Sequence, residues 1–290
     1  MNQANSQDTL PNHNMATTST PAIVINDEAP PPYNDNIPAP FEDEKPPIDI
    51  ATLSSSEKRE LVEADAISVL SSTTTLGISD LLFTPAKTLR IDAKGVAALR
   101  LPTPHADLET TIHNFDGSFA YASTREKKSS GNCILSDANG NALIATEYFF
   151  GPSKDPVLRR LDVGEGAQEI KTVSKWTSRN HKFLLPDGRT LAWTYKKEPG
   201  FGSRGAKGTA LVLTLGERRI AALVRNEDTR TPGSLATSAG NGGELVIGED
   251  VGGKAGIGED LVVATCLLML KKEIDRRRTV QFMVIAGVVL

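Results

Sequence analysis

The sequence contains little cysteine and few aromatic residues. Its 290 residues include two cysteines, Cys133 and Cys266, and aromatic side chains make up 5% of the chain. A disulfide framework or a thiolate metal site requires more cysteines, so neither is expected. Cys266 lies in an apolar segment, where a free thiol behaves as a small hydrophobic side chain.

Catalytic and metal-binding motifs are also missing. The four histidines, His13, His105, His113 and His181, form no HExxH or similarly spaced group, and no GxSxG elbow occurs. We therefore predict a non-enzymatic protein without a metal or other cofactor. An enzyme assembled from residues distant in sequence is the third alternative, and a pocket that combines His113 or His181 with a carboxylate would favour it.

No hydrophobic run is long enough to cross a bilayer. The apolar segment Leu261–Leu270 would be about 15 Å long as a helix, whereas the hydrocarbon core is about 30 Å thick. Residues 280–290 also fall short of a span. The first residues, MNQANSQDTLPNHN, lack the basic start and apolar core of a secretory signal. We expect a cytoplasmic protein without a transmembrane segment, able to attach to a membrane only peripherally.

Positive charge is in small excess in most of the chain. Residues 1–60 hold ten acidic and three basic side chains, a net charge of −7, and the rest carries +3. Nucleic-acid binding usually leaves a dense basic patch, so we expect no nucleic-acid partner. An acidic arm attached to a mildly basic folded part is the simplest description.

The sequence does contain strong hairpin signals. Asp116-Gly117, Asn139-Gly140 and Asp187-Gly188 each separate two strand-like segments, and such pairs are favoured in tight turns that need a positive φ. Further strands are expected at residues 88–92, 96–101, 170–178, 209–215, 219–226 and 244–248. Many short strands at this spacing, without alternating helices, predict a mainly β antiparallel barrel or sandwich.

One helix is expected after the last of these strands, over about residues 259–277. Its Leu261–Leu270 portion is apolar on every helical face, and such a helix must be buried. A closed barrel of about ten to twelve strands around this helix satisfies that requirement. The apolar, β-branched residues Thr279–Leu290 are interpreted as a last strand or a packed tail, and the sequence leaves open whether residues 280–290 instead extend the helix.

The chain is expected to divide into three parts. Residues 1–56 are rich in proline and polar residues, and are predicted to form a disordered acidic arm. Residues 57–80 would provide a short helix, within Glu57–Leu70, and a linker. Residues 81–290 would form the barrel domain.

The arm contains a short partner motif. Pro30, Pro31, Pro32 and Tyr33 match PPxY, which WW domains bind because proline favours the polyproline II shape and the tyrosine ring fills a pocket. The predicted contacts are Pro30, Pro31 and Tyr33, and the expected partner is a WW-containing ubiquitin ligase of the HECT type. The alternative is that a proline-rich tail produces the motif by chance.

Two basic groups suggest an anionic phospholipid surface as an alternative partner. The first is a turn with Arg125, Lys127 and Lys128, and the second is a helix end with Lys271, Lys272, Arg276, Arg277 and Arg278. Near an anionic membrane each such side chain contributes about 1 kcal/mol. The competing interpretation is a solvated turn, together with a helix end whose basic side chains compensate the helix dipole.

The order of hairpin strands followed by one hydrophobic helix resembles the tubby C-terminal-like superfamily, which includes LURP-one-related proteins and phospholipid scramblases. Ser136–Gly151 and Leu184–Trp193 are similar to hairpins of the LURP-one-related branch. From about Leu81 onward the chain also resembles uncharacterised fungal proteins of this type. The matching segments are Ser123–Asn132, Glu147–Pro152, Asp155–Arg159, Lys175–Ser178, Asp187–Arg189 and Leu270–Arg278. The resemblance implies a twelve-stranded barrel threaded by the helix, and phosphoinositide binding at membranes.

Overall fold

The computed structural model describes the folded domain and not the amino-terminal arm. The described residues are 83–97, 108–127, 130–150, 154–163, 168–175, 178–253 and 256–287. The chain divides into two units, Met1–Pro46 and Pro47–Leu290, and all described residues belong to the second. The expected arm of residues 1–56 and the helix and linker of residues 57–80 lie outside the described residues.

Twelve antiparallel strands form a closed barrel, as predicted. Strands that follow one another along the chain are neighbours, and β1 closes the ring by pairing with both β2 and β12. The strands are β1 (Pro85–Asp92), β2 (Glu109–Asn114), β3 (Phe119–Thr124), β4 (Cys133–Asp137), β5 (Ala142–Glu147), β6 (Val157–Arg160), β7 (Glu169–Val173), β8 (His181–Leu184), β9 (Thr190–Pro199), β10 (Lys207–Leu215), β11 (Arg218–Val224) and β12 (Glu244–Gly248). A 3-10 turn, η4 (Ser203–Gly205), lies between β9 and β10.

The three predicted hairpins are confirmed, together with their turn chemistry. Gly117, Gly140 and Gly188 have φ angles of 85°, 83° and 83°, values that favour glycine because it lacks a Cβ atom. They connect β2 to β3, β4 to β5 and β8 to β9. Three details differ from the expectation. Val96, predicted to begin a strand, forms only an isolated bridge with Ala239, and β6 was not predicted. The strand expected over residues 170–178 is β7, which already ends at Val173.

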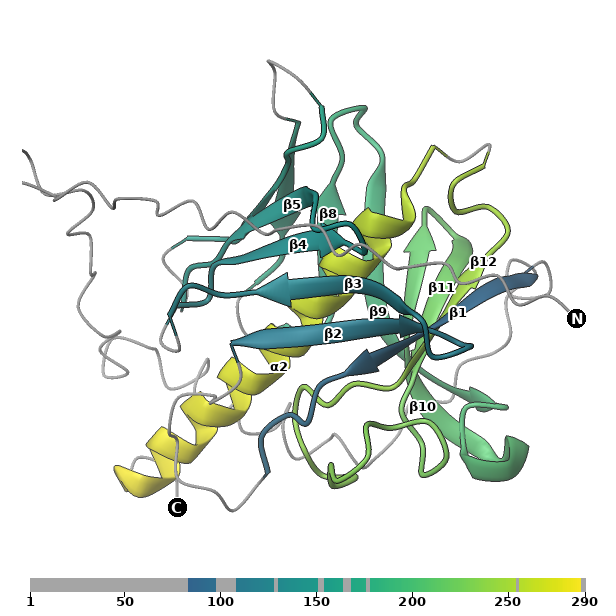
Figure 1. Cartoon of the computed structure of the whole chain (residues 1–290). Helices are drawn as coiled ribbons and strands as arrows, with labels where there is room; N and C mark the ends of the chain where they lie inside the picture. The colour runs from purple at the N-terminus through teal and green to yellow at the C-terminus, as the bar shows by residue number, and fades with distance from the viewer. Residues whose placement is uncertain are drawn as a thin grey trace, which may run out of the picture. The chain divides into compact units, whose positions relative to one another are not determined.

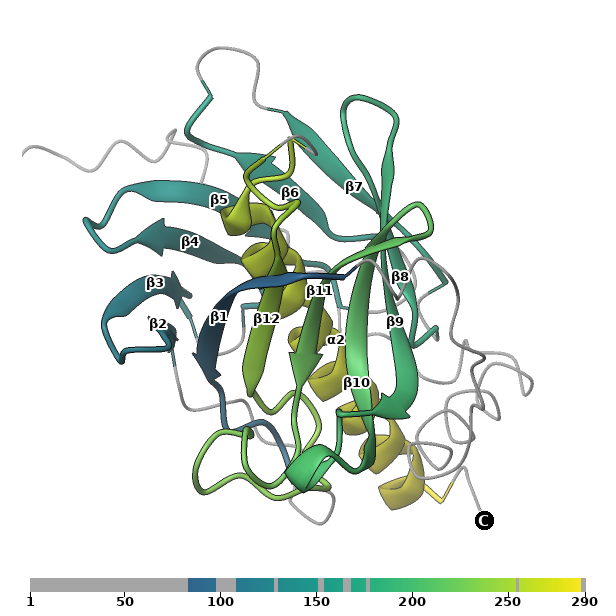
Figure 2. The ribbon, with the colours of Figure 1, turned by 90° about the vertical axis from the view of Figure 1, so that its right-hand side faces the viewer.

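The helix α2 (Glu259–Ile285) runs through the barrel (Figures 1 and 2). Every residue of Leu261–Leu270 is buried except Leu267, which is partly buried, so this segment is enclosed by protein as predicted. The indole nitrogen of Trp193 in β9 donates to Thr265 Oγ1 at 3.1 Å and joins the barrel wall to the helix. Within the described residues, no helix is both long and apolar enough to cross a membrane.

The predicted end of the helix is wrong. Residues expected as a strand or tail from Thr279 onward continue α2 as far as Ile285, and Met283 is still fully buried. The basic residues 271–278 therefore lie in the middle of the helix, and its last turn contains no basic side chain. Compensation of the helix dipole thus does not explain these charges.

Candidate functional site

The carboxyl-terminal half of α2 carries charged side chains into the barrel. Lys272, Glu273, Asp275 and Arg276 are each less than 9% exposed. Buried charges are costly unless they are paired and hydrogen-bonded, so partners are required on the barrel wall. These partners define the polar end of the interior.

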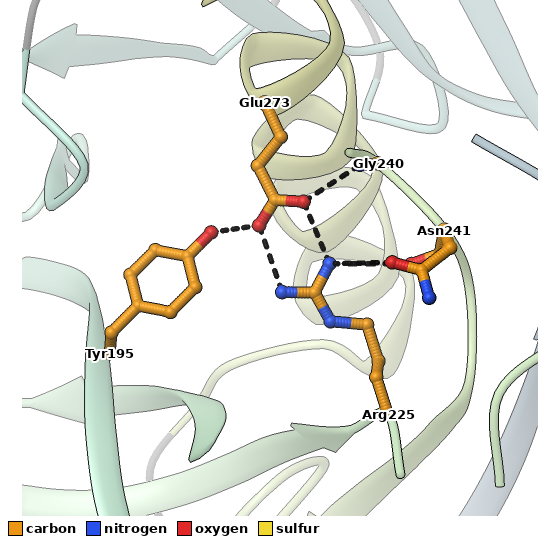
Figure 3. A network of polar contacts seen from close by, with 5 residues as sticks. All are labelled: Tyr195, Arg225, Gly240, Asn241 and Glu273. Atoms are coloured by element: carbon orange, nitrogen blue, oxygen red, sulfur yellow. Dashed lines mark hydrogen bonds and ion pairs between the residues drawn. The ribbon is translucent and has the colours of Figure 1, made fainter. Parts of the chain in front are cut away.

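Glu273 lies at the centre of a polar network (Figure 3). Arg225, which follows β11, approaches it with both terminal nitrogens, at 2.7 Å from Oε2 and 2.9 Å from Oε1. The backbone N–H of Gly240 donates to Oε2 at 2.8 Å, and the hydroxyl of Tyr195 in β9 donates to Oε1. The network therefore joins α2, β9 and both ends of the loop between β11 and β12.

Burial shifts the pKa values of the two charged members of this network, Glu273 and Arg225, in opposite directions. It raises the pKa of Glu273 to about 7, although Arg276 and the Gly240 N–H favour the carboxylate. It lowers the pKa of Arg225 to about 10, and Arg179 acts in the same direction. Between these two values both side chains are charged and the pair is ionic.

A pocket of about 640 Å³ opens beside the network. Its lining includes five arginines, namely Arg179, Arg225, Arg230, Arg276 and Arg277. Among its lining residues, Glu273 and Arg276 are buried, whereas Glu227 and Thr237 are exposed. Its volume is within the range of small-molecule sites. We call it the arginine pocket.

The basic residues predicted on the helix do not share one surface. Arg276 and Arg277 line the arginine pocket, whereas Lys271 and Arg278 line a separate cavity of about 90 Å³. Lys271 Nζ bonds to Asp275 at 2.8 Å and lies 4.9 Å from the Tyr148 ring centroid. Lys272 is buried, and burial lowers its pKa.

The basic residues predicted in the turn are also divided. Arg125 lines the small cavity with Arg278, so one member of each predicted basic group meets there. Lys127 is exposed, and Lys128 lies outside the described residues. The two groups therefore contribute mostly to the interior, rather than to one exposed patch.

His113 and His181 are the two histidines that would favour an enzyme if either shared a pocket with a carboxylate. His181 lines a cavity of about 410 Å³, whose described lining contains no acidic residue. His113 packs edge-on against Phe119, with ring centroids 6.0 Å apart. His13 and His105 lie outside the described residues, and among those described no group of histidine, cysteine or acidic side chains could hold a metal.

The stability of the domain should depend on the protonation of His181. Burial lowers the pKa of His181 to about 3 from 6.5, and Lys272 and Arg276 act in the same direction. Because the unfolded chain then binds the extra proton, the free energy of unfolding should decrease as the pH falls from 6.5 towards 3. Each pKa unit corresponds to about 1.4 kcal/mol, and between pH 6.5 and pH 3 the free energy of unfolding should fall by about 4 kcal/mol. This is slightly less than the whole shift would give, because the histidine is half protonated in the unfolded chain at the upper limit and in the folded protein at the lower one. Denaturant titrations across this range should give a shallower pH dependence for His181→Gln, and equal slopes would contradict the assignment.

The sequence predicted neither the network around Glu273 nor most of the arginine pocket. Glu273, Arg225, Tyr195, Arg179 and Arg230 were not among the expected site residues. One signal was available, because Glu273 and Asp275 interrupt a basic run in a helix that was expected to be enclosed. The predicted contacts Pro30, Pro31 and Tyr33 lie outside the described residues. Comparisons with protein-family models, curated proteins and solved structures found no match.

Proposed function

We propose that the protein is a non-enzymatic adaptor whose PPxY segment binds a WW domain. The observation that carries this proposal is the uninterrupted Pro30-Pro31-Pro32-Tyr33 motif in a proline-rich segment. Three consecutive prolines favour the extended shape that WW domains bind, and Tyr33 supplies the aromatic contact. The motif lies in a different unit of the chain from the barrel.

This proposal defines both a partner and a location. The partner is a cytoplasmic WW-domain protein, with HECT-type ubiquitin ligases as the first class to test. The barrel would supply the second binding function of an adaptor. The protein would then be either recruited to the ligase as a substrate or used to bring another molecule to it.

A peptide of residues 25–40 should bind a WW domain, and Tyr33→Ala should weaken this binding at least tenfold, because the domain loses its aromatic contact. Isothermal titration calorimetry would measure both affinities. Ile37→Ala, in the same peptide but outside the motif, is the matched control and should bind like the unaltered peptide. Equal affinities for the unaltered and Tyr33→Ala peptides would refute the motif.

The full chain provides the corresponding test in cells. Affinity purification with the unaltered protein and with Tyr33→Ala as baits should recover a WW-domain protein only with the first.

The second candidate function is binding of anionic phospholipid, including phosphoinositide, at a membrane surface. It is favoured by the arginine pocket, to which two predicted residues, Arg276 and Arg277, contribute. The resemblance to tubby-like proteins and scramblases supports the same function. The mostly interior placement of the other predicted basic side chains argues against a flat electrostatic attachment, and favours recognition of one head group in a pocket.

A further inference from the structure

We propose that the arginine pocket binds the phosphate groups of a small phosphorylated ligand. This inference deepens the second candidate function, because it assigns a site and a ligand chemistry. It does not depend on the WW-domain proposal. The shared chemistry is a phosphate ester, either free in solution or as the head group of a lipid.

The described lining of the pocket carries more positive than negative charge. Five arginines and two carboxylates, Glu227 and Glu273, line it among the described residues. Glu273 is already held by Arg225, and Glu227 is exposed. Positive side chains outnumber negative ones in the described lining by five to two, and such an excess of positive charge attracts an anion.

The guanidinium of Arg230 is available to bind a ligand. Arg230 lines the pocket and is half-buried, yet in the part of the chain that the structure describes its guanidinium has no hydrogen bond, ion pair or ring contact. A half-buried guanidinium gains from an anionic partner, and its planar fork matches phosphate oxygens in a bidentate manner. The pocket therefore contains a cation with donors available for a ligand.

Two arginines that line the pocket, Arg179 and Arg225, are held in place through Glu273. Arg179 stacks on Tyr195, with 4.3 Å between its guanidinium carbon and the ring centroid, and Tyr195 is held by Glu273. Arg225 is held by the same carboxylate. Glu273 thus acts as a positioning residue that orients two arginines before a ligand arrives, and this lowers the cost of ordering them.

Neutral donors and the size of the pocket narrow the ligand class. Hydroxyl side chains also line the cavity, namely Ser203, Thr209, Thr237 and Ser238. They suit the further oxygens of a phosphorylated polyol. A volume of about 640 Å³ matches a small organic molecule, so inorganic phosphate alone would leave most of the pocket unfilled.

The test measures ligand binding to the whole 290-residue chain by isothermal titration calorimetry and vesicle flotation. The soluble probes are inorganic phosphate and inositol hexakisphosphate. The vesicles are phosphatidylcholine with and without a phosphoinositide. The pocket variants are Arg230→Gln and Arg277→Gln. Arg218→Gln is the control, because Arg218 is exposed, pairs with Asp250 and begins β11, whereas the pocket residue Arg225 follows the other end of this strand.

Inositol hexakisphosphate should bind the unaltered protein more tightly than inorganic phosphate does, and each pocket variant should weaken its binding about tenfold or more. This is the effect of losing one charged hydrogen bond. Arg218→Gln should bind as the unaltered protein does. Thermal unfolding of each variant checks that it is folded. Arg230→Gln alone is enough to test the pocket, because among the described residues the Arg230 guanidinium has no hydrogen bond or ion pair to lose.

The arms of the experiment separate the two sources of phosphate. Soluble binding that depends on the pocket, without flotation, supports a free phosphorylated molecule. Flotation with phosphoinositide vesicles that Arg230→Gln and Arg277→Gln reduce supports a lipid head group. The proposal is overturned if the unaltered protein binds no probe, if the pocket variants bind equally well, or if Arg218→Gln weakens binding to the same extent. None of these results affects the Tyr33 peptide test.

Discussion

Val263→Asp should prevent the domain from folding. Val263 is fully buried in the part of α2 that the barrel encloses, and an aspartate there would place a carboxylate among apolar side chains. An uncompensated buried charge costs several kcal/mol, whereas the whole stability of a typical domain is about 5–15 kcal/mol. We expect the variant to lose the cooperative unfolding transition in denaturant and to show the circular dichroism of an unfolded chain.

Val284→Asp is the matched control for this prediction. It makes the same substitution in the same helix, at a position that is 56% exposed. Its stability should stay within about 0.5 kcal/mol of the unaltered protein, as is usual for surface substitutions. Similar destabilisation by both substitutions would mean that the barrel does not enclose one half of the helix more than the other.

Local chemistry explains why the barrel could be predicted. An Asn-Gly or Asp-Gly pair acts through the φ angle of one glycine, so the turns at Gly117, Gly140 and Gly188 are specified by a few adjacent residues. The apolar surface of Leu261–Leu270 requires burial whatever the surrounding sequence is. Both signals can be recognised without knowing any distant contact.

The predicted end of the helix is wrong because two local sequence signals both indicated a helix that ends before Thr279. Basic side chains favour a helix carboxyl terminus, and β-branched residues favour strands, so the sequence predicts a helix end near residues 271–278 and a strand or packed tail over residues 279–290. Both preferences are worth less than about 1 kcal/mol per residue, and packing of Met283 and Thr279 inside the domain outweighs them.

The candidate site could not be predicted for a different reason. Glu273 and Arg225 are 48 positions apart, and their contact exists only after β11 and α2 have been brought together by the closed sheet. A sequence shows that both residues are charged, but not which charges face each other. The predicted Arg276 and Arg277 belong to the pocket for the same topological reason, although the sequence predicts them only as part of a basic group that could contact anionic lipid.

Arg225→Met should cost about 3–5 kcal/mol of stability, the usual effect of removing one member of a buried ion pair. The substitution leaves the Glu273 carboxylate buried without its main partner, although Gly240 and Tyr195 still donate to it. Arg159→Met is the control, because Arg159 pairs with Glu147 and Glu169 but is 41% exposed. It should cost less than about 1 kcal/mol. Denaturant unfolding at about pH 8 measures both.

The pH dependence and a double variant distinguish an unpaired charge from a simple loss of packing. Loss of Arg225 removes a cation, so Glu273 should keep its proton to higher pH than in the unaltered protein, whereas in the unfolded chain it releases this proton near 4.5. Since the folded state then binds more protons, the free energy of unfolding of Arg225→Met should decrease as the pH rises from about 5 to about 8. Adding Glu273→Gln removes the carboxylate, and should therefore restore part of the stability at about pH 8 and abolish this extra pH dependence. If the double variant were no more stable than Arg225→Met alone, the cost would come from the lost arginine side chain, and the network would not be held together by its charges.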